Sequence, residues 1–375
     1  MKSWDAIVVG AGIIGLSLAI ELNKQGLRVL VVEKGEPVRE ASWAAGGMLC
    51  DFPSETPPGL LELATASARM YPEFVHELED ESGLKIDLRP VGTLLFAGEG
   101  KGHSPVTTQS PQDPSLQSSQ SFSLPESVRE LEPALRVPDE TTPHLTALYA
   151  TALYIKERSV DPRHLTAAAL AAARHRGIDF SSGNHVLAVE MAHGNAFGIR
   201  TNKTQFAAGM VVNCAGAWAG QIGPHTFPTR PVKGQMLCVA MPQKELVRHV
   251  VRAPDVYLIP RSDGRIIVGT TVEEAGYDKR IDVTTIQRLH RAAIALVPEL
   301  RNAKILEDWA GLRPGTPDAL PILGATTTLG YYVATGHFRD GILLAPITAY
   351  LMAQVIQEEN PSHDLTTFSP TRFPN

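Results

Sequence analysis

Residues 5–33 have the pattern of one strand–helix–strand unit, and this unit restricts the fold more than any other part of the chain. Residues 5–9 are a short apolar run, typical of a strand buried on both faces, which ends at Gly10. Apolar residues then recur at helical spacing until Gly26, and residues 27–32 read as a second strand, which ends at Glu33. The pattern predicts two parallel strands joined by a crossover helix, as in an α/β domain.

The turn between the first strand and the helix has the glycine spacing of a dinucleotide-binding site. Gly10, Gly12 and Gly15 form the pattern G-x-G-x-x-G, and an acidic residue, Glu33, ends the second strand. The first glycine permits the tight turn, the second lets the backbone approach a pyrophosphate, and the third lets helix and strand pack closely. The helix N-terminus would face the phosphates, and Glu33 would bind a ribose diol. The alternative is a glycine-rich turn without a ligand.

Composition argues against several other classes of protein. The chain has 375 residues and a net charge of −6, which does not favour nucleic acid or an anionic membrane as a partner. Its three cysteines, Cys50, Cys214 and Cys238, are scattered without a C-x-x-C pair, and no histidines have metal-ligand spacing, so no metal site is expected. No apolar run is long enough for a signal peptide or a spanning helix, so we expect a soluble, cytoplasmic protein.

Four features favour FAD over NAD as the dinucleotide. The glycine-rich unit stands at the start of the chain, and a second stretch of small residues, 41–48, follows soon after Glu33. Residues 213–218 read as a strand running into a small-residue turn, and residues 335–342 begin a second strand–glycine–helix junction, whose helix N-terminus would face a flavin ring. No second G-x-G-x-x-G occurs between a strand and a helix, so a separate NAD(P)H domain is not expected.

The later chain alternates between α/β units and strand-rich regions. Asp161 and Pro162 are suited to begin an alanine-rich helix over 162–175, and residues 232–272 are rich in strands. Residues 98–125, rich in Ser, Gln, Thr and Pro, predict a long surface loop. We therefore expect an α/β fold in which a Rossmann-like FAD-binding domain is interleaved with a mostly antiparallel β-sheet substrate domain. The expected FAD-binding domain comprises 1–86, 145–225 and 310–375, and the expected substrate domain comprises 87–144 and 226–309.

These motifs resemble those of the D-amino-acid oxidase family of flavoenzymes. Besides the glycine-rich turn, the resemblance is carried by five segments: 44–49, 160–162, 256–261, 309–316 and 336–346. It covers nearly the whole chain and is weakest between about 98 and 125. Within the family, the chain is most similar to the members that oxidise glycine in thiamine thiazole synthesis.

The resemblance implies a substrate site built around two arginines and a tyrosine. Arg313 stands where the family binds the substrate carboxylate, Tyr257 where a phenol contacts the same group, and Arg339 where a second arginine faces the substrate. A guanidinium fork matches a carboxylate with two parallel hydrogen bonds, and a phenol can add a third. From the residues alone, Arg313 is equally explained as a partner of Asp308 or Asp318, Tyr257 as a packed core residue, and Arg339 as a surface charge.

The resemblance also implies the residues that contact FAD. They belong to the glycine-rich unit, the stretch after Glu33, one later strand and the loop before the last helix: Gly10, Gly12, Ile13, Ile14, Gly15, Glu33, Lys34, Ala41, Ser42, Gly46, Gly47, Met48, Val186, His337, Phe338, Arg339, Asp340, Gly341, Ile342 and Leu343. Cys214 and Cys238 are far in sequence from Arg313 and Arg339, so we expect the FAD to be non-covalent.

The implied reaction is hydride transfer from the neutral amine of a small amino acid to FAD. Glycine would give glyoxylate, ammonia and hydrogen peroxide, with molecular oxygen as the second substrate; sarcosine and small D-amino acids are further candidates. Asp255 and Val272 depart from the family pattern and leave the exact amine open. The alternatives are a sarcosine oxidase relative with covalent flavin, a membrane-associated dehydrogenase and a non-catalytic flavin-binding protein. The sequence is compatible with a homo-oligomer but does not predict one.

Overall fold

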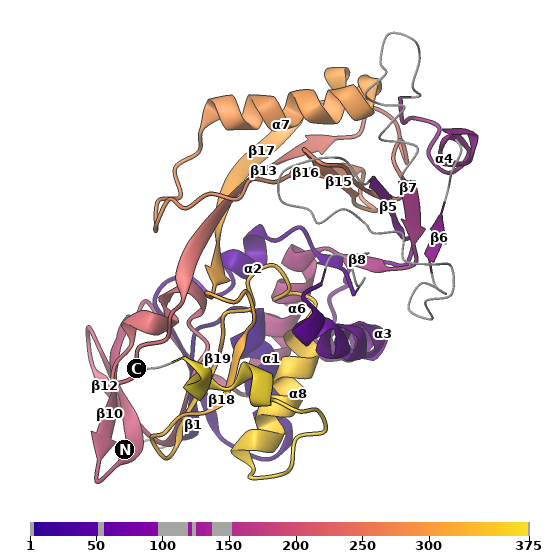
Figure 1. Cartoon of the computed structure of the whole chain (residues 1–375). Helices are drawn as coiled ribbons and strands as arrows, with labels where there is room; N and C mark the ends of the chain where they lie inside the picture. Colours follow the sequence, from indigo (N-terminus) through magenta and orange to yellow (C-terminus); the bar gives the residue numbers. More distant parts are fainter. Residues whose placement is uncertain (1–3, 52–55, 97–118, 122–124, 137–151, 374–375) are drawn as a thin grey trace.

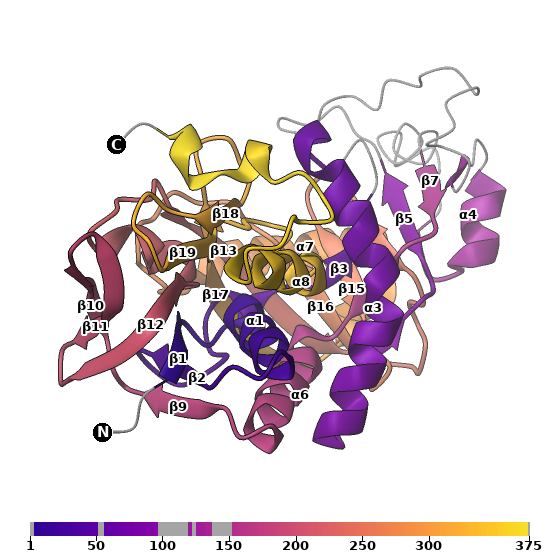
Figure 2. The ribbon, with the colours of Figure 1, turned by 90° about the horizontal axis from the view of Figure 1, so that it is seen from below.

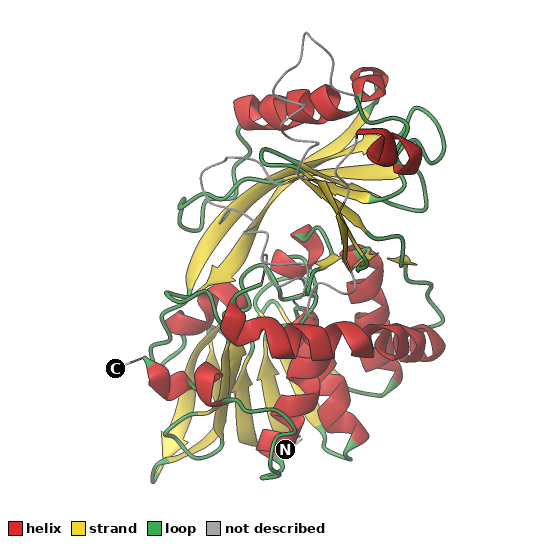
Figure 3. Ribbon diagram, turned by 45° about the vertical axis from the view of Figure 1, so that its right-hand side comes forward, coloured by secondary structure: helices red, strands yellow, loops and turns green. Residues whose placement is uncertain are grey.

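The computed structural model describes residues 4–51, 56–96, 119–121, 125–136 and 152–373. These residues form two large β-sheets, each covered by helices on one face, with a small sheet of three short strands beside them. Figure 3 shows the two large sheets and the helices that cover them. The α/β fold with a second, mostly antiparallel sheet, as expected from the sequence, is confirmed.

Parallel strands form the centre of the first sheet, and they carry the dinucleotide motif. In order across the sheet, the parallel strands are β19 (Tyr331–Thr335), β12 (Gln205–Asn213), β1 (Trp4–Val9), β2 (Val29–Glu33) and β9 (Asp179–Ser182). Antiparallel strands are added at one side: β10 (Val186–Ala192), β11 (Asn195–Thr201) and β18 (Ile322–Ala325). The continuous apolar runs of the sequence thus became strands buried on both faces, as such runs do in parallel sheets.

Four helices cover one face of the first sheet, as Figure 2 shows. They are α1 (Ile13–Lys24), α3 (Leu61–Ser82), α6 (Pro162–His175) and α8 (Ala345–Ile356). Alternate strand residues face opposite sides, so that Ala6 and Val8 pack against these helices while Ile7 and Val9 pack under β10 and β11. The side chain of Asp161 accepts a hydrogen bond from the backbone N–H of Arg163 (2.9 Å), which confirms the expected cap of α6.

The second sheet is antiparallel except for one strand pair, and it lies above the first in Figure 1. Its strands, in order, are β17 (Ile305–Gly315), β13 (Arg230–Ala240), β16 (Arg265–Gly269), β15 (Tyr257–Pro260), β14 (Val250–Arg252), β5 (Thr93–Phe96), β7 (Ala152–Ile155) and β6 (Ser119–Ser121). Helix α7 (Val283–Leu296) covers the outer face. The inner face packs against α2 (Ala41–Ala44) of the first domain through Trp309, Met236 and Ile259.

The shorter elements include α4 (Pro125–Leu131), the 3₁₀ turn η3 (Gly216–Gln221) and the three-stranded sheet of β3 (Met48–Leu49), β8 (Arg158–Val160) and β4 (Leu88–Arg89). Among the described residues, no helix has the length and apolar character needed to cross a membrane.

Two strands of the second sheet depart from the domain division expected from the sequence: β7 lies wholly within a range assigned to the first domain, and β17 crosses an expected boundary. β7 pairs with β5 and β6 although residues 145–225 were assigned to the first domain, and β17 continues to Gly315, past the expected boundary at 310. Both strands are identified by their distant partners, which a local pattern does not contain. Most of the loop predicted over 98–125 lies outside the described residues, but residues 119–121 form the edge strand β6.

Candidate functional site

A cavity of about 400 Å³ lies between the two sheets. On one side it is lined at the carboxyl ends of the parallel strands β1, β2, β12 and β19, where α/β sheets bind ligands. On the other side it is lined by inward-facing residues of the second sheet, including Tyr257 and Arg313. Every site residue expected from the sequence lies on its wall except Gly15 and Leu343.

The three positions of the first turn are glycine for different structural reasons. A Cβ on Gly10, whose φ is +105°, would lie 2.5 Å from the carbonyl oxygen of Cys214, and one on Gly15 would lie 2.0 Å from the carbonyl oxygen of Gly10. These two glycines are required by the fold itself, and Gly15 serves the close packing expected of it. A Cβ on Gly12 would meet only the Ser42 hydroxyl, at 3.2 Å. The space in front of Gly12 is therefore open to a ligand.

Glu33 and Ser42 fix the turn around this open space. The Glu33 carboxylate accepts hydrogen bonds from the backbone N–H groups of Ala11 (2.9 Å) and Gly35 (3.0 Å). The Ser42 hydroxyl accepts one from the N–H of Ile13 (3.0 Å), the first residue of α1. A carboxylate has about four acceptor positions, so Glu33 keeps capacity to bind a ribose diol from the cavity.

The glycines at 46 and 47 are required by packing against other parts of the chain. A Cβ on Gly46 would lie 2.7 Å from Cδ1 of Ile259, and one on Gly47 would lie 2.0 Å from the carbonyl oxygen of Val160. The guanidinium of Arg261, from the second sheet, donates hydrogen bonds to the carbonyls of Gly46 (2.7 Å) and Val160 (3.1 Å). These contacts alone require both glycines, and the expectation that they let the backbone approach a ligand stays a prediction.

Lys34 and Trp218 form the end of the cavity beside Glu33. The Lys34 ammonium lies 2.9 Å from the centroid of the Trp218 ring and 3.5 Å from the Glu40 carboxylate. Desolvation lowers the pKa of Lys34, although Glu40 opposes this. His185 also lines this end. Neither Trp218 nor His185 is among the site residues expected from the sequence; the signals available were the position of Trp218 at the end of the strand-to-turn segment 213–218 and that of His185 next to Val186.

The loop after β19 lines the opposite end of the cavity, through residues 337–342. His337 is buried, and its Nε2 lies 3.1 Å from the Thr348 hydroxyl. Burial lowers the pKa of His337 to about 3, so the imidazole is neutral. Arg339 is exposed while lining the cavity, and its guanidinium lies 5.2 Å from the centroid of the Phe338 ring.

Leu343 does not reach the cavity, contrary to the expectation. Its side chain is buried in the core formed with α3 and α8. The Ser67 and Tyr71 hydroxyls of α3 each donate a hydrogen bond of 2.6 Å to this turn, at the carbonyls of Leu343 and Ile342. The residues that line the cavity therefore end at Ile342, just before α8 begins at Ala345, and the expectation that this helix N-terminus faces a flavin stays a prediction.

Asp340 gives this loop a titratable group in the neutral pH range. Desolvation raises the pKa of Asp340 to about 7, although Arg339 opposes this. Because the pKa of this carboxylic acid is raised in the folded state, the folded protein loses stability as pH rises from the ordinary value near 4 to about 7. We expect Asp340→Asn to stabilise the apoprotein more at pH 8 than at pH 5, as measured by thermal unfolding. An equal shift at both pH values would contradict this assignment.

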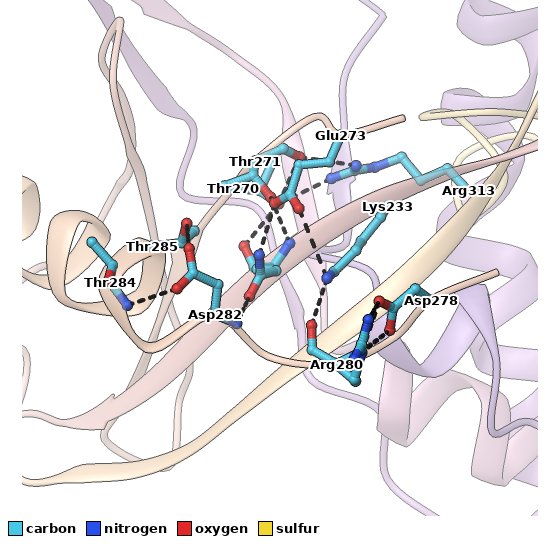
Figure 4. Close-up of polar contacts among 11 residues, drawn as sticks. Lys233, Thr270, Thr271, Glu273, Asp278, Arg280, Asp282, Thr284, Thr285 and Arg313 are labelled. Atoms are coloured by element: carbon cyan, nitrogen blue, oxygen red, sulfur yellow. Dashed lines mark hydrogen bonds and ion pairs between the residues drawn. The ribbon is translucent and has the colours of Figure 1, made fainter. Parts of the chain in front are cut away.

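Gly234 on β13 leaves room for the guanidinium of Arg313 on β17, and Gly269 on β16 leaves room for the ring of Tyr257 on β15. A Cβ on Gly234 would lie 2.4 Å from the guanidinium nitrogens, and one on Gly269 would lie 2.6 Å from the Tyr257 ring. The Arg313 guanidinium donates to the carbonyl of Thr271 (3.1 Å) and the hydroxyl of Thr270 (3.0 Å), as Figure 4 shows. Both acceptors are uncharged, and within the described chain no carboxylate lies within 4.0 Å of Arg313. Desolvation lowers the pKa of Arg313 but leaves it a cation.

The alternative partners considered for Arg313 are otherwise engaged or absent from its surroundings. Asp318 pairs with Arg372 at 2.8 Å, so the pairing of Arg313 with Asp318 is wrong.

Tyr257 lies beside Arg313, and its hydroxyl points to Sδ of Met236 over 3.6 Å, a weak contact. Burial raises the pKa of the Tyr257 phenol, so the hydroxyl keeps its proton and can donate. The two departures from the family pattern, Asp255 and Val272, both lie on the cavity wall.

Two cysteines line the cavity despite their distance in sequence from Arg313. Cys214 follows β12, and Cys50 lies near Arg252, whose guanidinium is 3.2 Å from its sulfur. The argument from sequence distance for a non-covalent flavin therefore does not hold in space. Burial raises the pKa of the Cys214 thiol to about 12, which keeps it protonated and a poor nucleophile. Cys238 is buried in the core between the sheets.

Comparison with known proteins gives consistent matches over the whole chain. The family model DAO, described as FAD dependent oxidoreductase, matches residues 5–355. The chain is 34% identical over 98% of its length to the bifunctional protein ThiO/ThiG of Trichormus variabilis, but it spans only 55% of that relative. It is 32% identical to glycine oxidase of Pseudomonas aeruginosa, over 97% of this chain and 98% of that protein. The crystal structure of glycine oxidase from Geobacillus kaustophilus has a TM-score of 0.88 at 30% identity, with 100% of both chains covered.

Proposed function

The chain belongs to the DAO family of FAD-dependent oxidoreductases, and on that premise we propose that it oxidises the amine of a small amino acid, with glycine as the first candidate. Glycine would lose two electrons and two protons to give an imine, dioxygen would take them up as hydrogen peroxide, and water would hydrolyse the imine to glyoxylate and ammonia. The similarity to glycine oxidases supports this choice. The similarity to ThiO/ThiG supports a role in thiamine thiazole synthesis.

The residues that line the cavity fit FAD in their chemistry. The open space before Gly12 admits a pyrophosphate at the start of α1, and Glu33 offers acceptors to a ribose. Residues 337–342 stand at the other end, where a ring system beside the substrate would lie. FAD, when bound, supplies the two-electron acceptor for the amine. We propose that it is held without a covalent bond; acid precipitation should then release all yellow colour from the protein, and colour that stays with the protein would contradict this.

The Arg313 guanidinium is the observation that carries the proposed substrate class. It lies on the cavity wall between the two sheets, with only uncharged acceptors bonded to it among the described residues. A cation held in this way favours an anionic ligand, and a carboxylate matches its planar fork. Binding the carboxylate fixes the α-carbon and its amine in one orientation, which is the main contribution that the protein makes to a reaction of this kind. The Tyr257 hydroxyl, which lines the same cavity, would donate a further hydrogen bond to the carboxylate.

Tyr257→Phe tests this contact. We expect the KM for glycine to rise roughly tenfold, because a hydrogen bond to a charged group contributes about 1.5 kcal/mol. The exposed Tyr350 on α8, which does not line the cavity, gives the matched control Tyr350→Phe. Steady-state assays of both variants, each loaded with FAD, should separate them. Equal KM values for Tyr257→Phe and the wild type would place the phenol outside the substrate site.

A substrate panel tests the proposed function. Protein loaded with FAD is supplied with glycine, sarcosine, D-alanine or D-proline under air, and hydrogen peroxide is measured. We expect peroxide in equal amount to the amine consumed, with glycine among the active substrates. Loss of yellow colour with glycine under anaerobic conditions, without peroxide under air, would indicate a dehydrogenase instead. No colour loss with any amine would indicate a different substrate class.

A further inference from the structure

We propose that Glu273 is a positioning residue that fixes the guanidinium of Arg313 for the substrate carboxylate through Thr271. This inference rests on the proposed function and adds a residue to its substrate site. Glu273 belongs to the irregular segment 270–282, which joins β16 to α7 and contributes Thr270 and Val272 to the cavity wall. The contacts between this segment and Arg313 are shown in Figure 4.

The position of Arg313 depends on the two threonines that accept its hydrogen bonds. A guanidinium bonded to one backbone carbonyl and one hydroxyl can point correctly only if the segment that bears them is itself fixed. Thr271 is fixed through its side chain: its hydroxyl donates a short hydrogen bond to the Glu273 carboxylate and accepts one from the backbone N–H of Gln235 (2.9 Å). Thr271 is buried, so these contacts are shielded from competing water.

Glu273 is in turn held on β13 from three directions. Its carboxylate accepts a hydrogen bond from the side-chain amide of Gln235 (2.8 Å) and lies 3.8 Å from the ammonium of Lys233. Its backbone N–H and carbonyl pair with the carbonyl and N–H of Lys233, both at 2.9 Å. The Lys233 side chain is 6% exposed and that of Glu273 is 32% exposed, so the ammonium is buried while the carboxylate is partly open to solvent. The contacts with Gln235 and Lys233 nevertheless give the carboxylate a defined place rather than a mobile surface position.

This arrangement orders Arg313 without occupying it. A carboxylate bonded directly to the guanidinium would compete with the substrate for the same fork. Glu273 instead acts through Thr271, so the donors of Arg313 that face the cavity keep their affinity for an anion. The later part of the segment is also anchored. The Tyr277 hydroxyl donates to the carbonyl of Ala217 (2.9 Å), and Lys279 pairs with Glu40 (3.0 Å), so both contacts lie at the end of the cavity that Lys34 and Trp218 form.

The test compares Glu273 with its neighbour Glu274. Glu274 is exposed and pairs with Arg230 at 3.1 Å, so Glu274→Ala removes a carboxylate of the same segment without touching Thr271. We expect Glu273→Ala to raise the glycine KM and the dissociation constant of acetate, a carboxylate that is not oxidised, by about tenfold, with kcat changed less than twofold. Binding in the ground state and transition state is weakened equally, which gives this split. Acetate binding is followed by the change in flavin absorbance.

Two further variants separate positioning from folding. Glu273→Gln keeps an oxygen that accepts from Thr271 and should restore most of the acetate affinity. Thr271→Val removes the other partner of the same hydrogen bond and should raise both constants as Glu273→Ala does, which keeps the test decisive if that variant does not fold. FAD content and thermal unfolding are measured for each protein.

The outcomes distinguish this inference from the proposed function. If the wild type binds neither glycine nor acetate, both the proposed function and the positioning role of Glu273 are contradicted. If the wild type binds them and folded, flavin-loaded Glu273→Ala or Thr271→Val binds them equally well, only the positioning role is overturned. The same conclusion follows if Glu273→Ala and Glu274→Ala have equal effects, or if Glu273→Gln behaves like Glu273→Ala.

Discussion

Arg313→Ala is expected to raise the KM for glycine by about 30-fold or more while FAD stays bound. Removing one partner of a buried, hydrogen-bonded charge pair costs about 2–5 kcal/mol, and each 1.4 kcal/mol is a factor of ten in affinity. FAD binding should persist because Gly12 and Glu33, which would hold the dinucleotide, belong to the first sheet and contact other parts of the chain. Steady-state kinetics and the flavin content of the purified variant measure the two effects.

Two variants sharpen the test of Arg313. Arg313→Lys keeps the positive charge but loses the planar fork, so its KM should fall between those of the wild type and Arg313→Ala. Arg280→Ala is the matched control, because Arg280 is exposed and its side chain bonds only to Asp278 among the described residues. An unchanged KM in Arg313→Ala would remove this arginine from the substrate site and with it the main support for an amino-acid substrate.

Gly12→Val is expected to abolish most FAD binding while the protein still folds. Gly12 has φ −78° and ψ 178°, which any residue adopts, and the space before it is open except for the Ser42 hydroxyl. A valine side chain would therefore fill the place of a pyrophosphate rather than displace the protein's own backbone. Overfilling of such a site costs on the order of 3 kcal/mol, which is roughly a 100-fold loss of affinity. Titration of the apoprotein with FAD gives the affinity, and circular dichroism gives the fold.

Gly15→Ala provides the contrast, because its Cβ would lie 2.0 Å from the carbonyl oxygen of Gly10 and would force the backbone to move. This variant should lose thermal stability even without FAD, whereas Gly12→Val should unfold close to the wild-type temperature. If Gly12→Val binds FAD as tightly as the wild type, the glycine-rich turn is not the phosphate site. If Gly12→Val is unfolded, the valine side chain collides with the protein itself, and the space before Gly12 is not open.

The glycine-rich unit and the helices could be predicted because their signals are local. An apolar run, a turn of glycines and a helix follow one another within residues 5–24, and the closing acidic residue comes soon after. Helix α6 carries its own cap in Asp161 and its own start in Pro162. Resemblance to a known family added Arg313 and Tyr257, for which the sequence by itself left structural roles equally open.

The sequence by itself thus determined the α/β class, the dinucleotide turn and the main helices, because residues close in the chain specify them. Only the tertiary structure showed that Arg313 is bonded to Thr270 and Thr271, about forty positions away, and that Trp218 lies against Lys34. It also placed Leu343 in the core and β7 in the second sheet. These features depend on strand pairing and packing between distant segments, and such contacts leave no periodic trace in the sequence around either partner.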